Sequence, residues 1–271
     1  IPYGEWKESS KQTEYTEKTR LLAADGTLLA KGWARKNVFD YNRNYVKKGI
    51  ISRKEWDFYT IFDDEMQILI SFANINIGGY VAAKLLNLKT GEVICDCVQY
   101  FAGANKHVSH VKADSPGRFK DKIGKTEFDF HTKENERTLY FKMNVKGKDV
   151  ICNFHMDIAP DLENITTVFP FDEDNTKYFM TTKQMCMPCE GTFRYGDYVY
   201  EVSDAFCIVS LAVKVYMDSA GVVCECSVSS KLPYYLLKVF NVLSVCKDGA
   251  YQLNAVFTAC TNLSAVFFSL A

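Results

Sequence analysis

From Cys207 to Ala271 the sequence contains no arginine, no tryptophan and no histidine. Charge is scarce there too, because only eight of the 68 residues from Asp204 onward are charged, against 57 of the 203 residues before it. Half of the ten cysteines also fall after Phe206. The exposed faces of a soluble domain need charge wherever they lie, so we interpret the chain as two parts of different character.

The sequence also lacks the local motifs of several enzyme classes. It contains no Gly-rich phosphate loop, no nucleophile elbow around a serine and no HExxH helix. The net charge of −1 provides no long-range field that would attract nucleic acid. We therefore predict no cofactor, no metal and no nucleic-acid partner, and the sequence carries no signal for an oligomeric state.

Long apolar runs are missing up to Phe206, since none approaches the roughly 20 residues that span a bilayer. The longest candidate, Ala255–Ala271, is interrupted by polar residues such as Thr258 and Asn262. A buried or misfolded tail is the favoured interpretation of this run, and a tail anchor is the alternative. We predict no clear membrane span.

The number of cysteines bears on the redox state of the compartment in which the protein lies. Ten cysteines without a signal peptide favour a reducing environment, so we predict a cytoplasmic protein. The first residue is Ile1 and not Met, which leaves open a missing or removed N-terminal segment.

Short apolar or aromatic runs, separated by Gly, Asp and Asn turns, predict an all-β fold. The runs are Trp56–Phe62, Met66–Ala73, Tyr80–Leu88, Val93–Phe101, Lys125–Thr132, Thr138–Val145, Val150–Ile158, Thr166–Phe169, Tyr178–Met185 and Gly191–Val202. Asp25-Gly26 between two further apolar runs predicts a tight hairpin. The short connections favour an antiparallel up-and-down barrel over a sandwich, and the Lys- and Gly-rich stretch Ala102–Gly124 reads as a long loop.

The strand-like runs after Phe206 have low charge and no paired turn signals. They are Ile208–Tyr216, Gly221–Val228 and Tyr234–Val245. Exposed segments of this composition are prone to aggregation, so we do not assign them to a native sheet.

Cys186-Met187-Pro188-Cys189 is a lone C-x-x-C. Redox chemistry would need one thiol at a helix N-terminus, and a zinc site would need a second pair of ligands. The flanks look like strand, so we interpret both cysteines as incidental thiols.

The most suggestive cluster combines two tryptophans with arginines and an asparagine in a short span. Its candidate ligand-binding residues are Trp33, Arg35, Asn42, Arg43 and Trp56. An arginine stacked on a tryptophan, with Asp57 as its counter-ion, could seal one end of a barrel. The same set could instead hold a polar headgroup above an apolar cavity.

Two stretches resemble a known family. The first is Leu22, Asp25-Gly26, Lys31-Gly32-Trp33-Ala34-Arg35, Tyr41-Asn42-Arg43 and Lys54-Glu55-Trp56-Asp57, and the second is Met187-Pro188-Cys189-Glu190-Gly191, Tyr200 and Asp204-Ala205-Phe206. Both resemble domain of unknown function family 2804, over roughly residues 20–206. That family looks related to lipocalin-like proteins, including the hydroxyneurosporene synthase group. The resemblance implies a lipocalin-like (calycin-type) β-barrel, or a strongly curved antiparallel sheet, with an apolar interior.

The chain departs from the family after Phe206. The family continues with a signature of the type Leu-Asp-Trp-Gly-Arg-Gly and a Trp-rich second half, whereas this chain reads Cys207–Lys214 and has no later tryptophan. Our hypothesis is a change of reading frame near Phe206, and a divergent or spliced C-terminus is the alternative. The predicted organisation is a polar segment at 1–20, a lipocalin-like β domain at 21–203 and an atypical low-charge segment at 204–271.

Three functions are compatible with these residues. The preferred one is binding of an apolar or amphipathic small molecule or lipid in the β domain. The second is an isoprenoid- or carotenoid-modifying enzyme of the hydratase or cyclase type, for which Asp57 is the one candidate proton donor. The third is a degenerate product without an independent function.

Overall fold

The computed structural model describes residues 12–46, 53–74, 78–102, 116–162, 164–171 and 175–215, and within these ranges it contains fourteen strands and one short 3-10 helix. The elements are β1 (Thr19–Arg20), β2 (Gly32–Ala34), β3 (Phe39–Asp40), η1 (Arg43–Tyr45), β4 (Arg53–Phe62), β5 (Met66–Asn74), β6 (Gly78–Asn87), β7 (Val93–Ala102), β8 (Gly117–Ile123), β9 (Thr126–Thr132), β10 (Glu136–Val145), β11 (Lys148–Asp157), β12 (Asn164–Pro170), β13 (Tyr178–Tyr195) and β14 (Tyr198–Val215). No helix in these ranges is long and apolar enough to cross a membrane.

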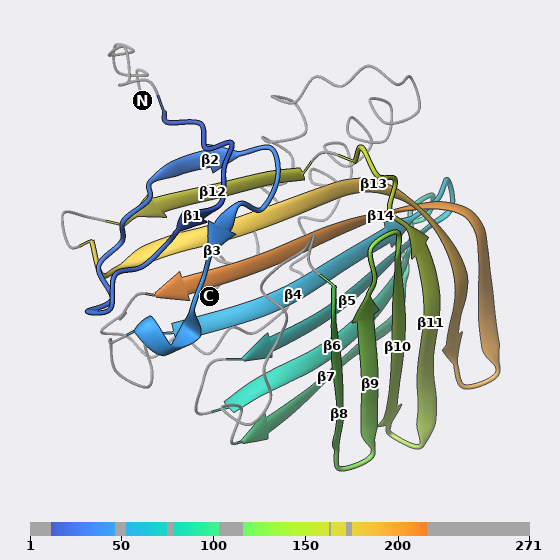
Figure 1. Ribbon diagram of the computed structural model, residues 1–271. Coiled ribbons are helices and arrows are strands. Elements are labelled where there is room, and N and C mark those ends of the chain that lie inside the picture. Colours follow the sequence, from blue (N-terminus) through green and yellow to red (C-terminus); the bar gives the residue numbers. More distant parts are fainter. Residues whose placement is uncertain are drawn as a thin grey trace, which may run out of the picture.

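Twelve of the strands form one antiparallel sheet (Figure 1). Its order is β7-β6-β5-β4-β14-β13-β11-β10-β9-β8, with β12 also paired to β13 and β2 paired to β12. Two meanders flank the central β13–β14 hairpin, and we call β4–β7 the first wing and β8–β11 the second wing. β1 and β3 form a separate parallel ladder.

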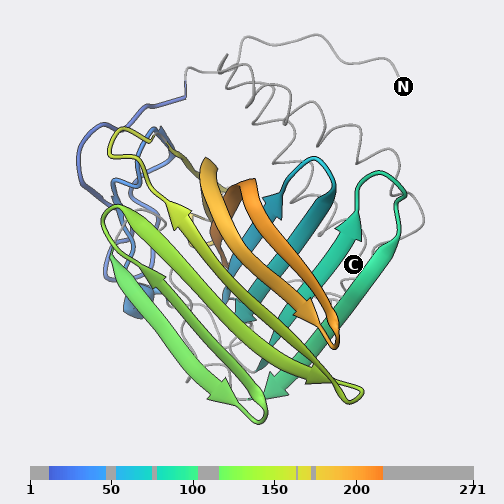
Figure 2. The ribbon, with the colours of Figure 1, turned by 90° about the vertical axis from the view of Figure 1, so that its right-hand side faces the viewer.

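The central hairpin connects the two wings because its strands are 18 residues long. Residues 206–215 of β14 pair with β4 in the first wing, and residues 189–195 of β13 pair with β11 in the second wing. The β13–β14 register shifts between Gln184 and Met187 and again between Cys189 and Gly191. Such bulges bend a ladder and increase its twist, and the two wings face one another (Figure 2).

The space between the wings is filled by aromatic side chains. The ring centroids of Phe72 in the first wing and Phe119 in the second lie 4.7 Å apart, and those of Tyr59 and Phe130 lie 5.5 Å apart. Gln99 of β7 donates a hydrogen bond to the carbonyl of Ile123 at the end of β8 (3.4 Å). We call this interior the main core.

Residues 12–46 form an N-terminal strap over one end of the inner face. Leu21, Leu22 and Phe39 of the strap are buried against Val213 and Val215 of β14, in a second, smaller apolar cluster that we call the strap core. Leu22 bridges Leu28 across the Asp25-Gly26 turn, which confirms the predicted hairpin.

The all-β prediction is confirmed, and of the two predicted forms the structure has the strongly curved sheet. Among the described residues β7 and β8 are the two ends of the strand order and do not pair, so the sheet does not close into a barrel. The predicted loop at Ala102–Gly124 is wrong for Gly117–Ile123, which forms β8, while residues 103–115 lie outside the described ranges.

The structure also corrects the interpretation of the run after Phe206. Residues up to Val215 continue β14 and pair with β4 without a register shift. Cys207, Val209 and Val213 are fully buried on the inner face. The runs Gly221–Val228 and Tyr234–Val245 lie outside the described residues.

Candidate functional site

A layer of polar side chains lies on the inner face between the main core and the strap core. Alternate residues of β4 place Glu55 and Asp57 on the same face as Tyr59 and Ile61, because side chains alternate along a strand. The other buried members come from neighbouring strands and from the facing wing. They are Asn74, Arg137, Asn164, Thr166, Thr182 and Gln184, all 5% exposed or less. We call this set, with Glu55 and Asp57, the polar layer.

The strand register places these groups in adjacent rows. Asp57 pairs with Leu211, Leu211 with Thr182, and Thr182 with Thr166. The hydroxyls of Thr166 and Thr182 lie 2.9 Å apart, within hydrogen-bond distance. The polar groups of β4 and those of β13 and β12 therefore lie on either side of β14, which contributes the apolar Leu211 between them.

Glu55 is the centre of a charged cluster at the strap end of the layer. It is fully buried, and its carboxylate lies 2.9 Å from Nη2 of Arg43 and 3.6 Å from Nε of Arg53. Tyr41 donates its hydroxyl to the other carboxylate oxygen at 2.9 Å. Arg43 and Arg53 keep 20% and 15% of their side chains exposed, although Nε and Nη2 of Arg43 and Nε of Arg53 are buried.

Tyr178 borders this cluster and is 1% exposed. Burial, followed by the charge of Glu55, raises the pKa of its hydroxyl above the usual range. Among the described residues the Tyr178 hydroxyl has no hydrogen-bond partner, and neither does Oε1 of the buried Gln184. A buried polar group without a partner is uncommon, and each case calls for an explanation.

Asp57 lies deeper, where the polar layer meets the main core. It is 1% exposed, and the neighbouring inward residue of β4 is the buried Tyr59. The guanidinium of Arg137, itself 1% exposed, lies 5.8 Å from the centroid of the Tyr59 ring. Burial raises the pKa of Tyr59, and the Arg137 charge opposes that rise. A carboxylic acid, a phenol and a guanidinium are thus gathered inside an aromatic interior.

The predicted ligand-binding residues do not all meet at one place. Arg43 belongs to the Glu55 cluster, and Asn42 caps η1 by accepting the Asn44 N–H at 3.0 Å. Arg35 stacks on Trp33 with its Cζ 5.4 Å from the ring centroid, as the structural interpretation of the cluster predicts. Arg35 forms an exposed ion pair with Glu14 at 3.2 Å, whereas Asp57 is buried on the inner face.

Trp33 and Trp56 lie on the opposite face of the sheet from the polar layer. Trp33 alternates with the buried Ala34, which pairs with Thr166 of the inner row. Trp56 alternates with Glu55 and Asp57, and its ring lies 5.8 Å from that of Phe179. The structure therefore separates both tryptophans from Arg43 and Asp57.

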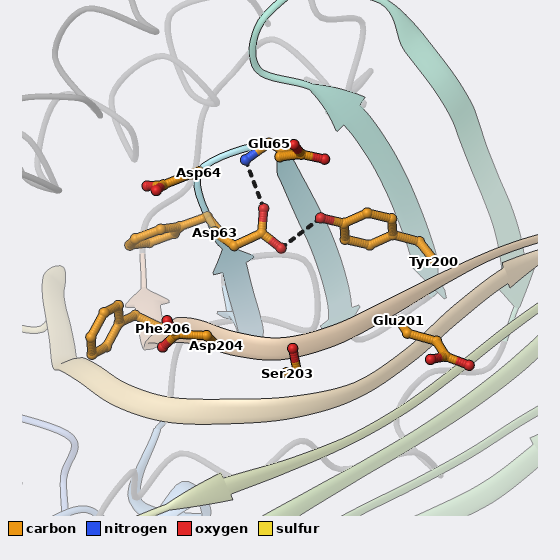
Figure 3. A pocket seen from close by; sticks show the side chains of 9 residues that line it. Asp63, Asp64, Glu65, Tyr200, Glu201, Ser203, Asp204 and Phe206 are labelled. Carbon is orange, nitrogen blue, oxygen red and sulfur yellow. Dashed lines mark hydrogen bonds between the residues drawn. The ribbon is translucent and has the colours of Figure 1, made fainter.

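A hollow of about 270 Å³ lies where the β4–β5 turn meets the first half of β14 (Figure 3). Its lining is acidic and aromatic, and comprises Phe62, Asp63, Asp64, Glu65, Tyr200, Glu201, Ser203, Asp204 and Phe206. Asp63 accepts the backbone N–H groups of Glu65 and Met66 (2.8 Å each) and the hydroxyl of Tyr200 (2.7 Å). This carboxylate fastens the turn to β14, which is a structural role.

Cys189 of the C-x-x-C is not a reactive thiol, and the described part of the chain holds no metal site. Cys189 of the C-x-x-C lies in β13 and is buried, and burial raises the pKa of its thiol to about 12. A reactive cysteine needs a lowered pKa. No group of three or more His, Cys, Asp or Glu side chains within the described ranges is arranged to hold a metal ion.

The family model for the domain of unknown function DUF2804 matches residues 12–212. The chain belongs to the DUF2804 family. No curated protein sequence matches the chain significantly. Among solved structures, kievitone hydratase from Nectria haematococca is 10% identical with a TM-score of 0.21, covering 74% of this chain and 97% of that one. An N-terminal dehydratase from the difficidin assembly line is 7% identical with a TM-score of 0.14, covering 60% and 79%. At these scores neither likeness carries an argument about activity.

The DUF2804 match contains the polar layer, the Glu55 cluster and β14 as far as Ala212. Sequence reasoning identified Asp57 and Arg43 but missed Glu55, Arg137 and Tyr178. The signal for Glu55 was present, because it shares the parity of Asp57 and Tyr59 along one strand. The sequence gave no signal for Arg137, because a single arginine at the start of an alternating strand usually faces solvent.

Proposed function

We propose that this protein binds an amphipathic small molecule on the inner face of its sheet. The polar end would contact the polar layer, and the apolar end would lie among the aromatic side chains of the main core. The observation that carries the proposal is the fully buried layer of charged and polar side chains between two apolar clusters.

Energetics support a functional role for this layer. Burying an ion pair gains little over packing apolar side chains of the same volume, so folding alone does not account for Glu55, Asp57 and Arg137 at 0–1% exposure. Small-molecule sites are mostly apolar, with a few polar groups that orient the ligand. Burying an apolar chain contributes roughly 25 cal/mol per Å² before entropy losses, so binding needs no catalytic group.

The first test is native mass spectrometry of the purified protein for co-purifying lipids, followed by titration with fluorescent fatty-acid and isoprenoid probes. We expect saturable binding of at least one probe. No co-purifying lipid together with no probe binding would reject the proposal.

Two substitutions locate the site. Arg137→Met removes a charge from the polar layer while keeping an apolar stem, and Trp56→Leu alters the opposite face. We expect Arg137→Met to weaken probe binding and Trp56→Leu to leave it close to the unchanged protein. The reverse result would move the site to the face that carries Trp33 and Trp56.

A second candidate function is hydration or cyclisation of an isoprenoid double bond, and the placement of Asp57 favours it. A proton donor for such chemistry is a carboxylic acid inside an apolar cavity, and Asp57 is 1% exposed at the edge of the aromatic core. Incubation with polyene substrates and analysis of the products tests this candidate. Unchanged turnover in Asp57→Asn would remove Asp57 from the reaction, and no turnover of any polyene would remove the reaction class.

A further inference from the structure

Two cysteines, Cys95 and Cys97, lie two residues apart on β7 with both thiols on the inner face. Side chains at alternate positions of a strand share a face, and both cysteines belong to the main core, where they are 3% and 4% exposed. Asp96 between them points to the other face and forms an ion pair with Lys84 at 2.7 Å. The strand therefore places two thiols next to one another.

The position of β7 in the sheet makes these thiols easier to reach than those of the central strands. Among the described residues β7 is one end of the strand order, and β6 is its one pairing neighbour. The β6–β7 register shifts between Leu85 and Leu86, next to Cys95. Strands at the end of a sheet open locally at a lower free energy than core strands do, and bulges interrupt the ladder further. A small oxidant can therefore reach this pair through local opening of β7.

The two thiols differ in their proton affinity. Cys97 donates a hydrogen bond to the carbonyl oxygen of Ala83, which lies 3.1 Å from the sulfur. Cys95 donates to the sulfur of Cys97, and this hydrogen bond lowers the pKa of Cys97 and raises the pKa of Cys95. The thiolate is the reactive form of cysteine. The pair therefore consists of a nucleophile, Cys97, and a neighbouring thiol that keeps its proton.

The other free thiols of the described residues have the opposite character. Cys152, Cys189 and Cys207 are buried, and burial raises the pKa of each. Among the free thiols that the structure describes, Cys97 is thus the one whose pKa is lowered.

The spacing of the pair permits a disulfide bond. A strand rises by about 3.3 Å per residue, which puts the Cα atoms of Cys95 and Cys97 roughly 6.6 Å apart. Disulfides join Cα atoms that are about 4.4–6.8 Å apart, so the pair lies near the upper end of the range. Disulfides away from the most common geometry are more easily reduced, which makes the bond reversible.

From these observations we infer that Cys95 and Cys97 are a redox modification site, at which a peroxide converts the two thiols into a reversible disulfide. The Cys97 thiolate attacks one peroxide oxygen, the O–O bond breaks, and the leaving hydroxide takes up the proton that Cys97 released. Water forms, and Cys97 becomes a sulfenic acid.

In the second step the Cys95 sulfur attacks the Cys97 sulfur. The S–S bond forms as the S–O bond breaks, and the departing hydroxide takes the Cys95 proton to give a second water. The two thiols lose two electrons in all, and one peroxide is reduced to two waters. This site is independent of the proposed ligand.

The experiment maps the disulfide in the full chain. The reduced and desalted protein is treated with hydrogen peroxide, its remaining thiols are alkylated, and it is digested with trypsin without reduction. Both cysteines fall in one tryptic peptide, Thr90–Lys106, so an internal disulfide gives an unalkylated peptide that lacks two hydrogens. We expect this peptide to form at least about 10-fold faster than Cys152, Cys189 or Cys207 become resistant to alkylation, and dithiothreitol to reverse it.

Three variants assign the roles of the two thiols. Cys95→Ser should leave a sulfenic acid on Cys97 that dimedone traps, whereas Cys97→Ser should give no dimedone adduct on Cys95. Cys152→Ser, which removes a buried thiol of the second wing, is the control and should leave oxidation of the peptide unchanged. The unchanged chain already tests the disulfide, so the test does not depend on the folding of any variant.

Three results would overturn the inference. The first is a Thr90–Lys106 peptide that stays fully alkylated while Cys189 or Cys207 is oxidised. The second is a disulfide from Cys97 to Cys152 in place of the internal one. The third is a bond within the peptide that dithiothreitol does not reduce. None of these results bears on ligand binding, so the proposed function stands or falls separately.

Discussion

Arg43 of the N-terminal strap and Glu55 of β4 form an ion pair of 2.9 Å in which the carboxylate is fully buried and the guanidinium is 20% exposed. The pair joins a segment that precedes the sheet to the strand on which most of the inner charge lies. Because Tyr41 of the strap also donates to Glu55, this one carboxylate holds the strap over the inner face.

Glu55→Gln should therefore destabilise the fold strongly. Removing the carboxylate leaves two guanidinium groups without their counter-ion, and breaking a buried pair in this way costs about 3–5 kcal/mol. The matched control is Glu14→Gln, which breaks the exposed pair with Arg35 and should cost less than about 1 kcal/mol. Urea unfolding followed by circular dichroism measures both. Equal urea midpoints for the two variants would show that the buried pair stabilises the fold no more than the exposed pair does.

Alkaline unfolding should be cooperative. Burial raises the pKa of Tyr41, Tyr59 and Tyr178 above the ordinary tyrosine value of about 10. The folded state then binds protons that the unfolded state releases, so their contribution is complete below pH about 10 and is lost as pH rises above it. Tyrosinate absorbance and far-ultraviolet circular dichroism should change together. Full ionisation of these tyrosines with the sheet intact would be incompatible with their burial.

Gly191→Ala should disrupt the junction between the hairpin and the second wing. Gly191 has φ +145, and an added Cβ would lie 2.1 Å from the carbonyl oxygen of Asn153 in β11. We expect a loss of about 3 kcal/mol or more, or an insoluble product. Gly147→Ala is the control, because Gly147 also has positive φ but no atom within 4 Å of the new Cβ, and should lose about 1 kcal/mol. Thermal unfolding and soluble yield distinguish the two variants.

The change of reading frame near Phe206 stays a prediction. The family match extends to residue 212 and β14 continues to Val215, both past Phe206. Sequencing of the gene and its transcript across the codons for residues 203–225 should reveal another frame with a Trp-rich continuation. A single open frame, transcribed intact, would make the low-charge segment native and would argue against a degenerate product.

Much of the fold followed from the sequence because the strands of the two wings carry the period-2 pattern and end in turn residues. Thr126–Thr132 alternates buried and partly exposed residues throughout, and Glu136–Val145 does so as far as Met143. β8 was missed because Phe119 is its one buried apolar residue and Arg118 and Lys120 flank it, which is the composition of a loop. The end of β14 was doubted because Ile208, Ser210 and Ala212 are also buried, so the strand does not alternate.

The candidate site was predictable only in part, because it depends on long-range register. The sequence places Trp56 beside Asp57, and the strand then sends the two side chains to opposite faces. Arg137 reaches Tyr59 across the interior from the other wing, a contact that no local pattern encodes. Glu55 was predictable from parity, whereas its partner Arg43 lies on a 3-10 turn whose orientation follows from packing of the strap.

The pairing of β4 with β14 has a consequence for biosynthesis. Phe62 and its partner Phe206 are separated by 144 residues, and of the described strands the partner strand is synthesised last. At usual elongation rates of about 5–20 residues per second, Phe206 is synthesised roughly 7–30 s after Phe62. During translation the nascent chain thus presents an unpaired strand edge and an uncovered aromatic face, and chaperones that hold such surfaces would govern the yield of native protein in the cell.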